Sequence, residues 1–372
     1  MNAFARLVTS REIVVCCGTG GVGKTTTAAV LAIEAARRGR RSVVVTIDPA
    51  KRLADALGLH ELTDEPKMID QQIWDVSDAV SESGSRSVGS LSALMLDTKS
   101  TFDKLVHEHA PDEHAAQRIL DNRFYRNVSG ALGGTQEYMA MEKLHELHTS
   151  GAFDLIVIDT PPSRHALDFL DAPQRLMKLL DNRMFRLLMM PTKTYMKVAG
   201  AALQALLRTV SRVVGREVVD DAIAFFQAFE GMEQGFRDRA AKVQALIDDP
   251  ATAFVLVTAP RRDAVDEATF FAQRLETNGL QVAGLIVNRI HPEFGAESPA
   301  TLRAMAHGNP MILNLADFRE VAMNERGTLT GLTDKIPSDA VGYVPLLDED
   351  VHDVRGLANV ATHLFTPALE PF

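Results

Sequence analysis

The sequence predicts an α/β fold in which a doubly wound, mostly parallel sheet receives an inserted α-helical subdomain. Short apolar, β-branched runs alternate with helix-like segments, and three of these runs end at a polar residue, Asp48, Asp159 or Asn288. Fully apolar strands are typical of parallel sheets that are covered on both faces. Two helix-rich stretches interrupt the alternation and predict the insertion.

Five strands are expected where the apolar runs lie, at residues 13–17, 42–47, 155–158, 253–257 and 282–287. The first strand leads through a glycine-rich loop into an Ala-rich helix that ends at Gly39. Helical periodicity marks the two interrupting stretches. The sequence therefore predicts core segments at residues 1–97, 151–172 and 248–372 and a helical subdomain formed by residues 98–150 and 173–247.

Composition excludes several classes of protein. With 372 residues, 46% of them apolar and 24% charged, the chain has the composition of a globular protein with a sizeable core. Its net charge of −10 disfavours nucleic acid as a partner. The longest stretch without Lys, Arg, Asp or Glu has fourteen residues, from Gly356 to Leu369, fewer than the roughly 18 that a membrane crossing needs. Since the first residues lack the features of a secretory signal, we expect a cytoplasmic protein, with peripheral attachment at the inner face of the membrane left open.

A phosphate-binding loop follows the first expected strand. The segment GTGGVGKT matches the eight-position pattern that holds phosphate groups, with a strand before it and a helix after it. Backbone N–H groups of such a loop converge on phosphate oxygens, the lysine bridges the outer phosphates, and the threonine hydroxyl ligates Mg²⁺. Lys24 is therefore expected to be catalytic as well as nucleotide-binding. The nucleotide-binding residues expected here are Gly18, Gly20, Gly21, Val22, Gly23, Lys24, Thr25 and Thr26.

Two aspartates are candidates for holding the metal and positioning water. Phosphoryl transfer needs acidic groups that hold Mg²⁺ and orient the attacking water. Asp159 ends the apolar run LIVID, and Asp48 ends the strand that follows the helix of the loop. We expect Asp159 to lie near the metal together with Thr25. An aspartate at a strand end also serves in many proteins only as a cap or turn residue, which is the alternative for both.

Five ordered motifs, over most of the chain, make the sequence similar to the ArsA-like ATPases. This family includes the arsenite pump ATPase and the Get-pathway ATPase that targets tail-anchored membrane proteins. GTGGVGKTT resembles its phosphate loop, TIDPAKRLADAL its switch I and DTPPSRHALDFLDAP its switch II. LIVNRI and VPLLDEDVHDVRGL resemble the segments that hold adenine. The resemblance implies an ATPase that uses ATP and Mg²⁺ and works as a dimer.

The resemblance also implies roles for individual residues. Asp48 would be the catalytic residue that orients the attacking water, and Asp159 would be the switch II acid near Mg²⁺. Asn288 and Pro345 would contact adenine. Glu267, in the segment AVDEATFF, would lie near the nucleotide across a dimer interface.

One departure from the family pattern concerns a charge in the phosphate loop. Thr19 occupies the position of the signature lysine that reaches across the dimer to the partner's nucleotide. Because threonine cannot supply that charge, we expect a heterodimer with a homologous subunit that keeps the lysine. The alternative is a homodimer in which another cation, Lys51 or Arg52 of switch I, takes over.

Two further departures affect switch II and the metal chemistry. Ser163 and Arg164 stand where the family has Thr-Gly, and arginine resists backbone geometries that glycine permits. The family's zinc-binding cysteine pair and the cysteines of an arsenite site are absent, which argues against the pump. The chain's two cysteines, Cys16 and Cys17, are adjacent in an apolar run and are expected in the core.

The second helical region is basic and rich in methionine. From Gln174 to Arg216 nine basic residues stand against one acid, and the pattern from Leu203 onward is that of an amphipathic basic helix. Flexible methionines suit a groove for hydrophobic client helices, but methionine also fills cores, so both interpretations stay open. Five of the fourteen methionines lie in this region, namely Met177, Met184, Met189, Met190 and Met196.

The predicted function is an Mg²⁺-dependent ATPase that couples ATP hydrolysis to handling a hydrophobic client or a membrane-associated partner. One alternative is a weakly hydrolysing regulatory subunit of a heterodimeric ATPase, because Thr19 replaces the lysine. An arsenite pump ATPase and a MinD-like positioning ATPase are further alternatives. The residues beyond Val351 offer no basic amphipathic membrane helix, which disfavours the last of these.

Overall fold

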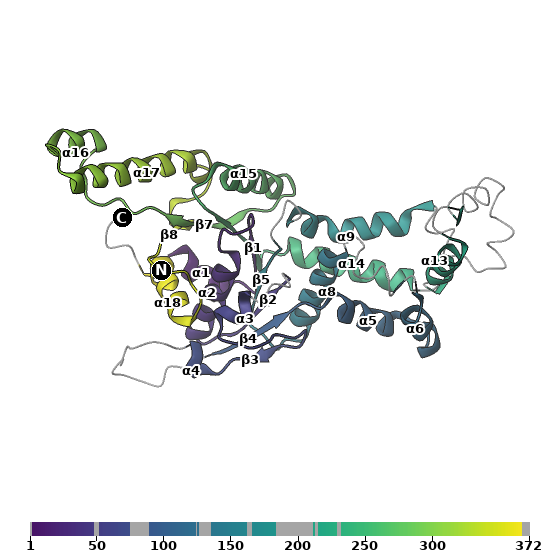
Figure 1. Ribbon diagram of the computed structural model, residues 1–372. Coiled ribbons are helices and arrows are strands. Elements are labelled where there is room, and N and C mark those ends of the chain that lie inside the picture. Colours follow the sequence, from purple (N-terminus) through teal and green to yellow (C-terminus); the bar gives the residue numbers. More distant parts are fainter. Residues whose placement is uncertain are drawn as a thin grey trace. The chain divides into compact units, whose positions relative to one another are not determined.

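The computed structural model describes residues 2–47, 52–74, 89–123, 125, 135–161, 166–183, 211–212, 215–228 and 232–366. The chain divides into two compact units (Figure 1). The first, here called the sheet unit, comprises Met1–Met95, Ser150–Leu167 and Pro250–Phe372. The second, called the helical unit, comprises Leu96–Thr149 and Asp168–Asp249.

In the described part of the sheet unit, eight strands form one sheet in the order β3-β4-β2-β5-β1-β6-β7-β8. Neighbouring strands run parallel except β3 and β4, which are antiparallel. The predicted α/β fold with a mostly parallel sheet is therefore confirmed. The strands are β1 (Ile13–Cys17), β2 (Arg41–Thr46), β3 (Lys67–Met68), β4 (Ser90–Met95), β5 (Leu155–Asp159), β6 (Thr252–Thr258), β7 (Val282–Ile290) and β8 (Val341–Pro345).

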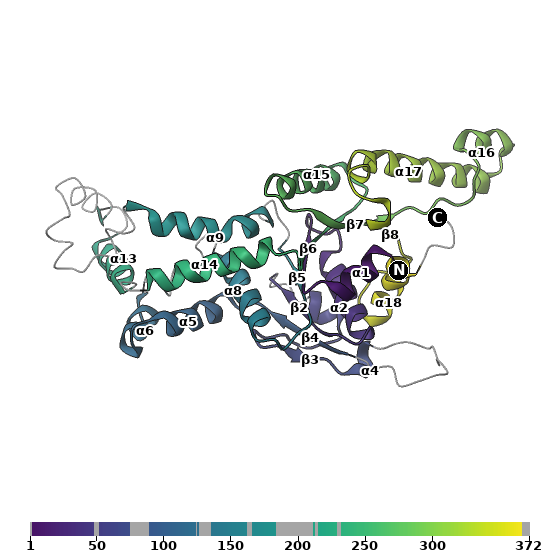
Figure 2. The same ribbon diagram turned by 180° about the vertical axis from the view of Figure 1, so that it is seen from behind.

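Helices cover both faces of this sheet. The connection β1–α2–β2 moves one way along the sheet and β6–α15–β7 moves the other way, so right-handed crossovers place α2 and α15 on opposite faces. Helices α1, α2 and α18 pack on one another (Figure 2). The helices of this unit are α1 (Ala3–Ser10), α2 (Lys24–Arg37), α3 (Arg52–Ala56), α4 (Gln71–Trp74), α15 (Arg262–Thr277), α16 (Pro299–Met305), α17 (Pro310–Thr333) and α18 (Val354–Phe365), with a 3₁₀ turn at Ser338–Ala340.

The central position of β1 determines where the phosphate loop lies. Strand β1 is hydrogen-bonded to β5 on one side and to β6 on the other, and every residue of β1 and β5 is buried. In this register Cys16 lies opposite Asp159, and Thr46 of β2 lies opposite the same aspartate. The carboxyl ends of three neighbouring parallel strands therefore meet beside the loop that follows Cys17.

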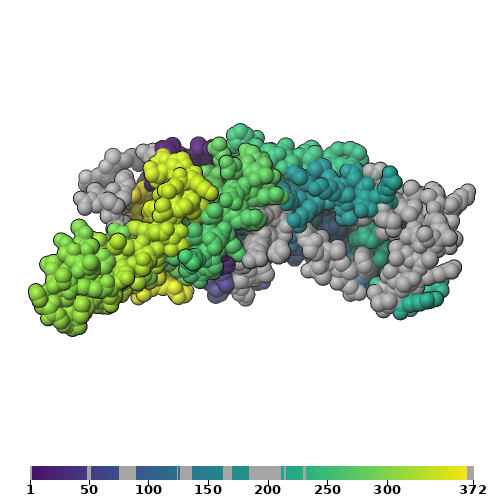
Figure 3. All heavy atoms as spheres, turned by 90° about the horizontal axis from the view of Figure 1, so that it is seen from above, coloured from purple at the N-terminus to yellow at the C-terminus, as the bar shows by residue number. Residues whose placement is uncertain are grey.

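A helical hairpin between β7 and β8, which the sequence analysis does not predict, is formed by α16 and α17. It is the light green to yellow-green part of the space-filling view (Figure 3). Arg303 on α16 forms ion pairs with Asp317 (2.8 Å) and Glu320 (2.5 Å) on α17. Large apolar side chains stay exposed on α17, Met311 at 81% and Phe318 at 41%. Because α17 is apolar on more than one side, its sequence lacks a clear amphipathic pattern.

The helical unit has a core of its own. Its aromatic members Tyr125 and Phe225 stack with ring centroids 6.0 Å apart. Beside this core, the buried carboxylate of Glu142 accepts hydrogen bonds from the Tyr138 hydroxyl and from Arg239 Nε. Burial is the main cause that raises the pKa of Glu142. The described helices are α5 (Thr98–His109), α6 (Glu113–Leu120), α8 (Thr135–Thr149), α9 (Ala166–Asp181, in this unit from Asp168), α13 (Arg216–Ala228) and α14 (Glu233–Asp248).

None of the helices in the described ranges combines the length and the apolar character that a membrane crossing requires.

A pH dependence of stability follows from His145 on α8. Burial, and to a smaller extent the nearby charges of Arg239, Lys242 and His148, lower the pKa of His145 from 6.5 to about 4. Between these two values the unfolded chain binds a proton that the folded chain excludes, so the free energy of unfolding falls as the pH drops through this window. We expect His145→Gln to lose less stability than the wild type between about pH 6.5 and about pH 4 in denaturant titrations.

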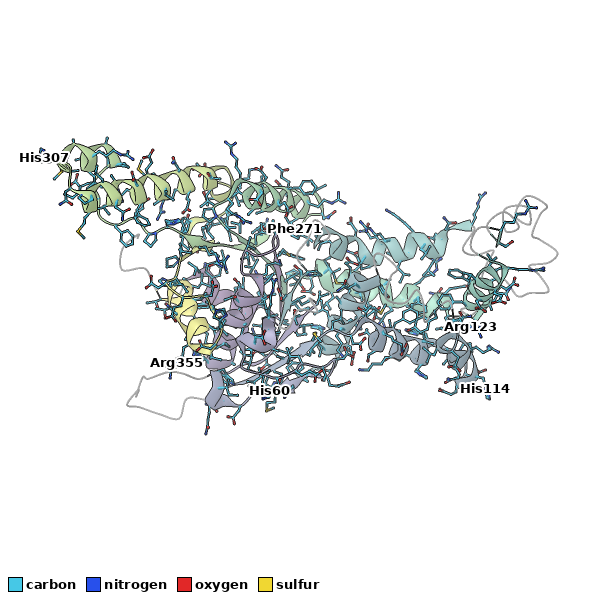
Figure 4. All side chains as sticks on the ribbon, in the orientation of Figure 1. His60, His114, Arg123, Phe271, His307 and Arg355 are labelled. Carbon is cyan, nitrogen blue, oxygen red and sulfur yellow. The ribbon has the colours of Figure 1, made fainter. Side chains whose placement is uncertain are left out.

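The control for this prediction is His114→Gln. His114 lies at the exposed surface of α6 (Figure 4), and this variant should keep the pH dependence of the wild type. If His145→Gln and the wild type lost the same free energy of unfolding over this window, the assigned role of His145 would be wrong.

Candidate functional site

The phosphate loop is held by two close approaches of its backbone to neighbouring strand ends. A Cβ atom on Gly18 would collide with the carbonyl oxygen of Val257 at the end of β6. A Cβ atom on Gly23, whose φ is +95°, would collide with the side-chain amide of Asn288 in β7. Glycine is required at Gly23 for both reasons, since other residues are strained at such φ values. The loop is thus fixed against the centre of the sheet.

Helix α2 begins at Lys24 and has no side chain that caps its first turn. The N–H groups of its first turn and the positive end of its dipole therefore face the loop, an arrangement that attracts phosphate. The side chain of Lys24 is almost fully buried, and its Nζ donates a hydrogen bond of 2.8 Å to the carbonyl of Thr19. The ammonium group therefore lies against the backbone of the phosphate loop, close to where a phosphate group would bind.

Oxygen ligands suited to a magnesium ion lie directly beside this lysine. Thr25 Oγ1 donates a hydrogen bond of 2.7 Å to Asp159 Oδ2, and Thr46 Oγ1 donates one of 3.1 Å to the same atom. Asp159 is 1% exposed. Mg²⁺ prefers carboxylate and hydroxyl oxygens and takes its remaining ligands from phosphate and water. The residues present therefore fit this ion.

Asn288 joins β7 to the phosphate loop. Its Nδ2 donates a hydrogen bond of 2.8 Å to the carbonyl of Val22, and its Oδ1 accepts one of 3.0 Å from the backbone N–H of Arg289. An amide has a second N–H and a second lone pair, so one donor and one acceptor remain for a ligand. Asn288 is thus both part of the loop's support and able to contact a base.

A pocket of about 450 Å³ opens beside these residues, within the range of small-molecule sites. Charged side chains of both signs line it, together with apolar side chains from the segment after β8. Its lining residues are Gly21, Gly23, Lys24, Thr25, Thr26, Arg52, Asp55, Ala56, Thr160, Asn288, Arg289, Pro345, Leu346, Leu347, Glu349, Asp350, Val351, His352 and Val360.

The comparisons with known proteins agree with this geometry. Residues 11–314 match the model of the family described as anion-transporting ATPase. The chain belongs to the anion-transporting ATPase family. The matched range includes the phosphate loop, Asp159 and Asn288. The resemblance to the ArsA-like family is confirmed, and this member of the anion-transporting ATPase family is an ATPase.

Curated relatives carry a consistent name. ATPase GET3 of Malassezia globosa is 24% identical over 365 residues, which cover 97% of this chain and 93% of that protein. ATPase get3 of Aspergillus terreus is 24% identical over 283 residues, covering 75% and 74%. ATPase get3 of Neurospora crassa is 29% identical over 163 residues, covering 44% and 43%.

The structure brings together most of the residues that the sequence analysis singled out in this anion-transporting ATPase. Asp159 lies beside Thr25, while Gly18, Gly20 and Val22 belong to the loop without lining the pocket. Glu267 lies on α15 and does not line the pocket, so its expected role across a dimer interface stays a prediction. Asp48, Lys51, Ser163 and Arg164 lie outside the described residues. The predicted residues that line the pocket are Gly21, Gly23, Lys24, Thr25, Thr26, Asn288 and Pro345.

Sequence reasoning missed several pocket residues. Asp55 lies shortly after Arg52 in switch I, and Glu349 and Asp350 lie in the acidic run after Pro345. Their closeness to these motifs in the sequence was the signal that could have identified them as pocket residues. Arg289 directly follows Asn288, but its position depends on a backbone conformation that the sequence does not indicate.

The steric requirement at Gly23 generates a test. We expect Gly23→Ala to lower nucleotide affinity at least about tenfold, or about 1.4 kcal/mol, because the new methyl group must displace Asn288 from the loop. Fluorescence titration with an ATP analogue measures the affinity.

Gly279→Ala is the matched control, because Gly279 has a similar φ of +76° but nothing within 4 Å of its Cβ position. Both variants should lose about 1 kcal/mol of stability through backbone strain. Only Gly23→Ala should lose nucleotide binding, and equal nucleotide affinities in the two variants would contradict the steric argument.

Proposed function

We propose that this ATPase binds ATP with Mg²⁺ in the pocket beside the phosphate loop, and that hydrolysis drives the handling of a hydrophobic client or a membrane-associated partner. The observation that carries the nucleotide part is the hydrogen-bonded pair Thr25 and Asp159 at the uncapped start of α2, next to Lys24. The hydroxyl and carboxylate groups are suited to bind a metal ion, and the ammonium group is suited to bind phosphate.

Each group at the loop has a separate task in this proposal. Lys24 leaves the Thr19 carbonyl and bridges the outer phosphates, because a charge-assisted hydrogen bond to phosphate is stronger than one to a neutral carbonyl. Thr25 and Asp159 hold Mg²⁺, which supplies positive charge where negative charge develops on the phosphate oxygens. Asp48 orients the attacking water, as the family resemblance implies.

The part of the pocket between Asn288 and the segment after β8 suits adenine. Asn288 has one N–H and one lone pair left, and these complement the N7 acceptor and the N6 donor of adenine. Guanine presents two acceptors at the same edge, so the amide oxygen would face an acceptor. Pro345, Leu346 and Leu347 supply the apolar wall against which a base packs.

The phosphate loop lacks the family's signature lysine, which reaches across the dimer to the partner's nucleotide. This replacement affects which partner subunit the chain would need. We propose assembly with a homologous subunit that carries the signature lysine; a homodimer is the alternative if a cation of this chain suffices. Arg52 lines the pocket and supports that alternative. A weakly hydrolysing regulatory subunit would result if neither cation were available to the site.

Arsenite is a poor candidate for the transported or bound ligand. Cys16 and Cys17 are buried, as predicted, at 0% and 1% exposure, and burial raises the pKa of both thiols. A soft metalloid needs accessible thiolates. A client site in the helical unit fits the composition of that unit better.

The proposed client site depends on the methionine-rich region. Met177, within the described residues, is half-buried and packs against the core of the helical unit, which supports a structural role for this one methionine. The other four, Met184, Met189, Met190 and Met196, lie outside the described residues. The proposal for these four depends on their flexible thioethers and on the family resemblance.

Steady-state ATP hydrolysis by the purified chain tests the nucleotide proposal. We expect Lys24→Ala to abolish hydrolysis and Thr19→Lys to raise it by about 10² or more at concentrations that allow dimerisation, because the new cation stabilises charge on the partner's phosphates. Full activity of the native chain alone, unchanged by Thr19→Lys, would reject the heterodimer; activity that survives Lys24→Ala would reject the proposed site.

The client proposal is tested by capture of a model helix of about 20 apolar residues. We expect the double variant Met189→Asp with Met190→Asp to bind this helix at least about tenfold less tightly, because each charge must be desolvated in an apolar groove. Met311→Asp, at a methionine that is 81% exposed on α17, is the matched control. Unchanged capture by a folded double variant would remove the groove.

A further inference from the structure

Arg289 has an unusual backbone conformation at the edge of the nucleotide pocket. Its φ is +61°, in the left-handed region that arginine rarely adopts. The pairing of β7 with β8 shifts register between Asn288 and Ile290, so Arg289 is the extra residue of a β-bulge. Bulges near active sites redirect a side chain, and backbone strain that persists at a site points to a function.

The bulge directs the Arg289 guanidinium toward the mouth of the pocket. Nη1 lies 3.4 Å from the carbonyl oxygen of Gly21 in the phosphate loop. Nη2 lies 3.9 Å from Asp350 Oδ1 in the segment after β8. Both contacts are long, and the two side chains are 55% and 76% exposed. Such contacts contribute little to stability, so they do not explain why the strained conformation is kept.

Lys24 provides a comparison within the same loop. Both cations donate to a carbonyl of the loop, Lys24 to that of Thr19 and Arg289 to that of Gly21. A neutral carbonyl is a weaker acceptor than a phosphate oxygen, so a polyphosphate that enters the pocket competes for both cations. The contact made by Arg289 is the longer and the more exposed, so it is the easier one to break.

We propose that Arg289 is a second phosphate-binding cation of this chain, which leaves Gly21 and Asp350 and binds the phosphate chain of the bound nucleotide. This inference rests on the proposed binding of ATP in this pocket. A guanidinium forms paired hydrogen bonds with phosphate oxygens, which a neutral threonine at position 19 cannot do. The amide of Asn288 is proposed to contact the edge of the base. The phosphate chain is therefore the part of the nucleotide that a further cation would bind.

Arg289→Gly separates this role from a structural one, because glycine adopts φ near +61° without strain. We expect this variant to unfold at a higher temperature than the wild type when no nucleotide is present. We also expect its affinity for ATP to fall about tenfold, its affinity for ADP to fall less and its affinity for AMP to fall least, in competition with a fluorescent ATP analogue.

Two control variants address strain and the ion pair. His307 is the other described non-glycine residue with positive φ, at +43°, and it lies in the turn between α16 and α17 (Figure 4). His307→Gly should also raise the unfolding temperature, with unchanged ATP affinity. Asp350→Asn should bind ATP more tightly, because a negative charge leaves the pocket.

Three results would overturn the proposal. The first is unchanged ATP affinity in Arg289→Gly, and the second is an equal loss for ATP, ADP and AMP, which would indicate a contact to the base or ribose. The third is a lower unfolding temperature with weaker ATP binding in both Arg289→Gly and Asp350→Asn, which would indicate a structural clasp. Failure of the wild type to bind ATP would instead reject the proposed function, so the two failures are distinguishable.

Discussion

The contact between the phosphate loop and two strand ends is the constraint on which the site depends. Gly18 lies against the carbonyl of Val257, and Gly23 lies against the amide of Asn288. Because neither position has room for a side chain, the loop backbone lies directly on the ends of β6 and β7. The same contacts bring Asn288, the residue proposed to contact adenine, to within hydrogen-bond distance of the loop, at 2.8 Å from the carbonyl of Val22. The proposed phosphate and base contacts thus share one support.

The order of the strands in the sheet places the acidic residue of the site beside the phosphate loop. Since β5 lies between β1 and β2, Asp159 at its end faces both Thr25 at the start of α2 and Thr46 at the end of β2. Two hydroxyl groups that donate to one carboxylate oxygen fix the orientation of this buried side chain. A carboxylate and a hydroxyl group that are held side by side are suited to a hard cation, and this arrangement follows from the strand order.

Secondary structure could be predicted from the sequence where a residue pattern had a single physical cause. The strands β1, β2, β5, β6 and β7 were predictable because strands that are buried on both faces must be apolar throughout. Strand β8 was not, because its sequence VGYVP contains glycine and proline, and β4 was not, because SLSALM follows a Gly/Ser-rich stretch. The hairpin of α16 and α17 was missed because α17 is apolar on several sides. Arg289 was missed because a bulge and a left-handed backbone arise from pairing between distant strands.

The replacement at Thr19 changes the charge of the loop without changing the contact that Lys24 makes. Lys24 donates to the backbone carbonyl of Thr19, and every residue type provides such a carbonyl. The resting position of the buried ammonium group therefore does not depend on whether lysine or threonine occupies position 19. A lysine at that position would add a second cation to the same loop, beside Lys24, which is buried at 6% exposure. On the proposed function, the threonine therefore removes an electrostatic contribution at the phosphates and leaves the contact between Lys24 and the loop backbone in place.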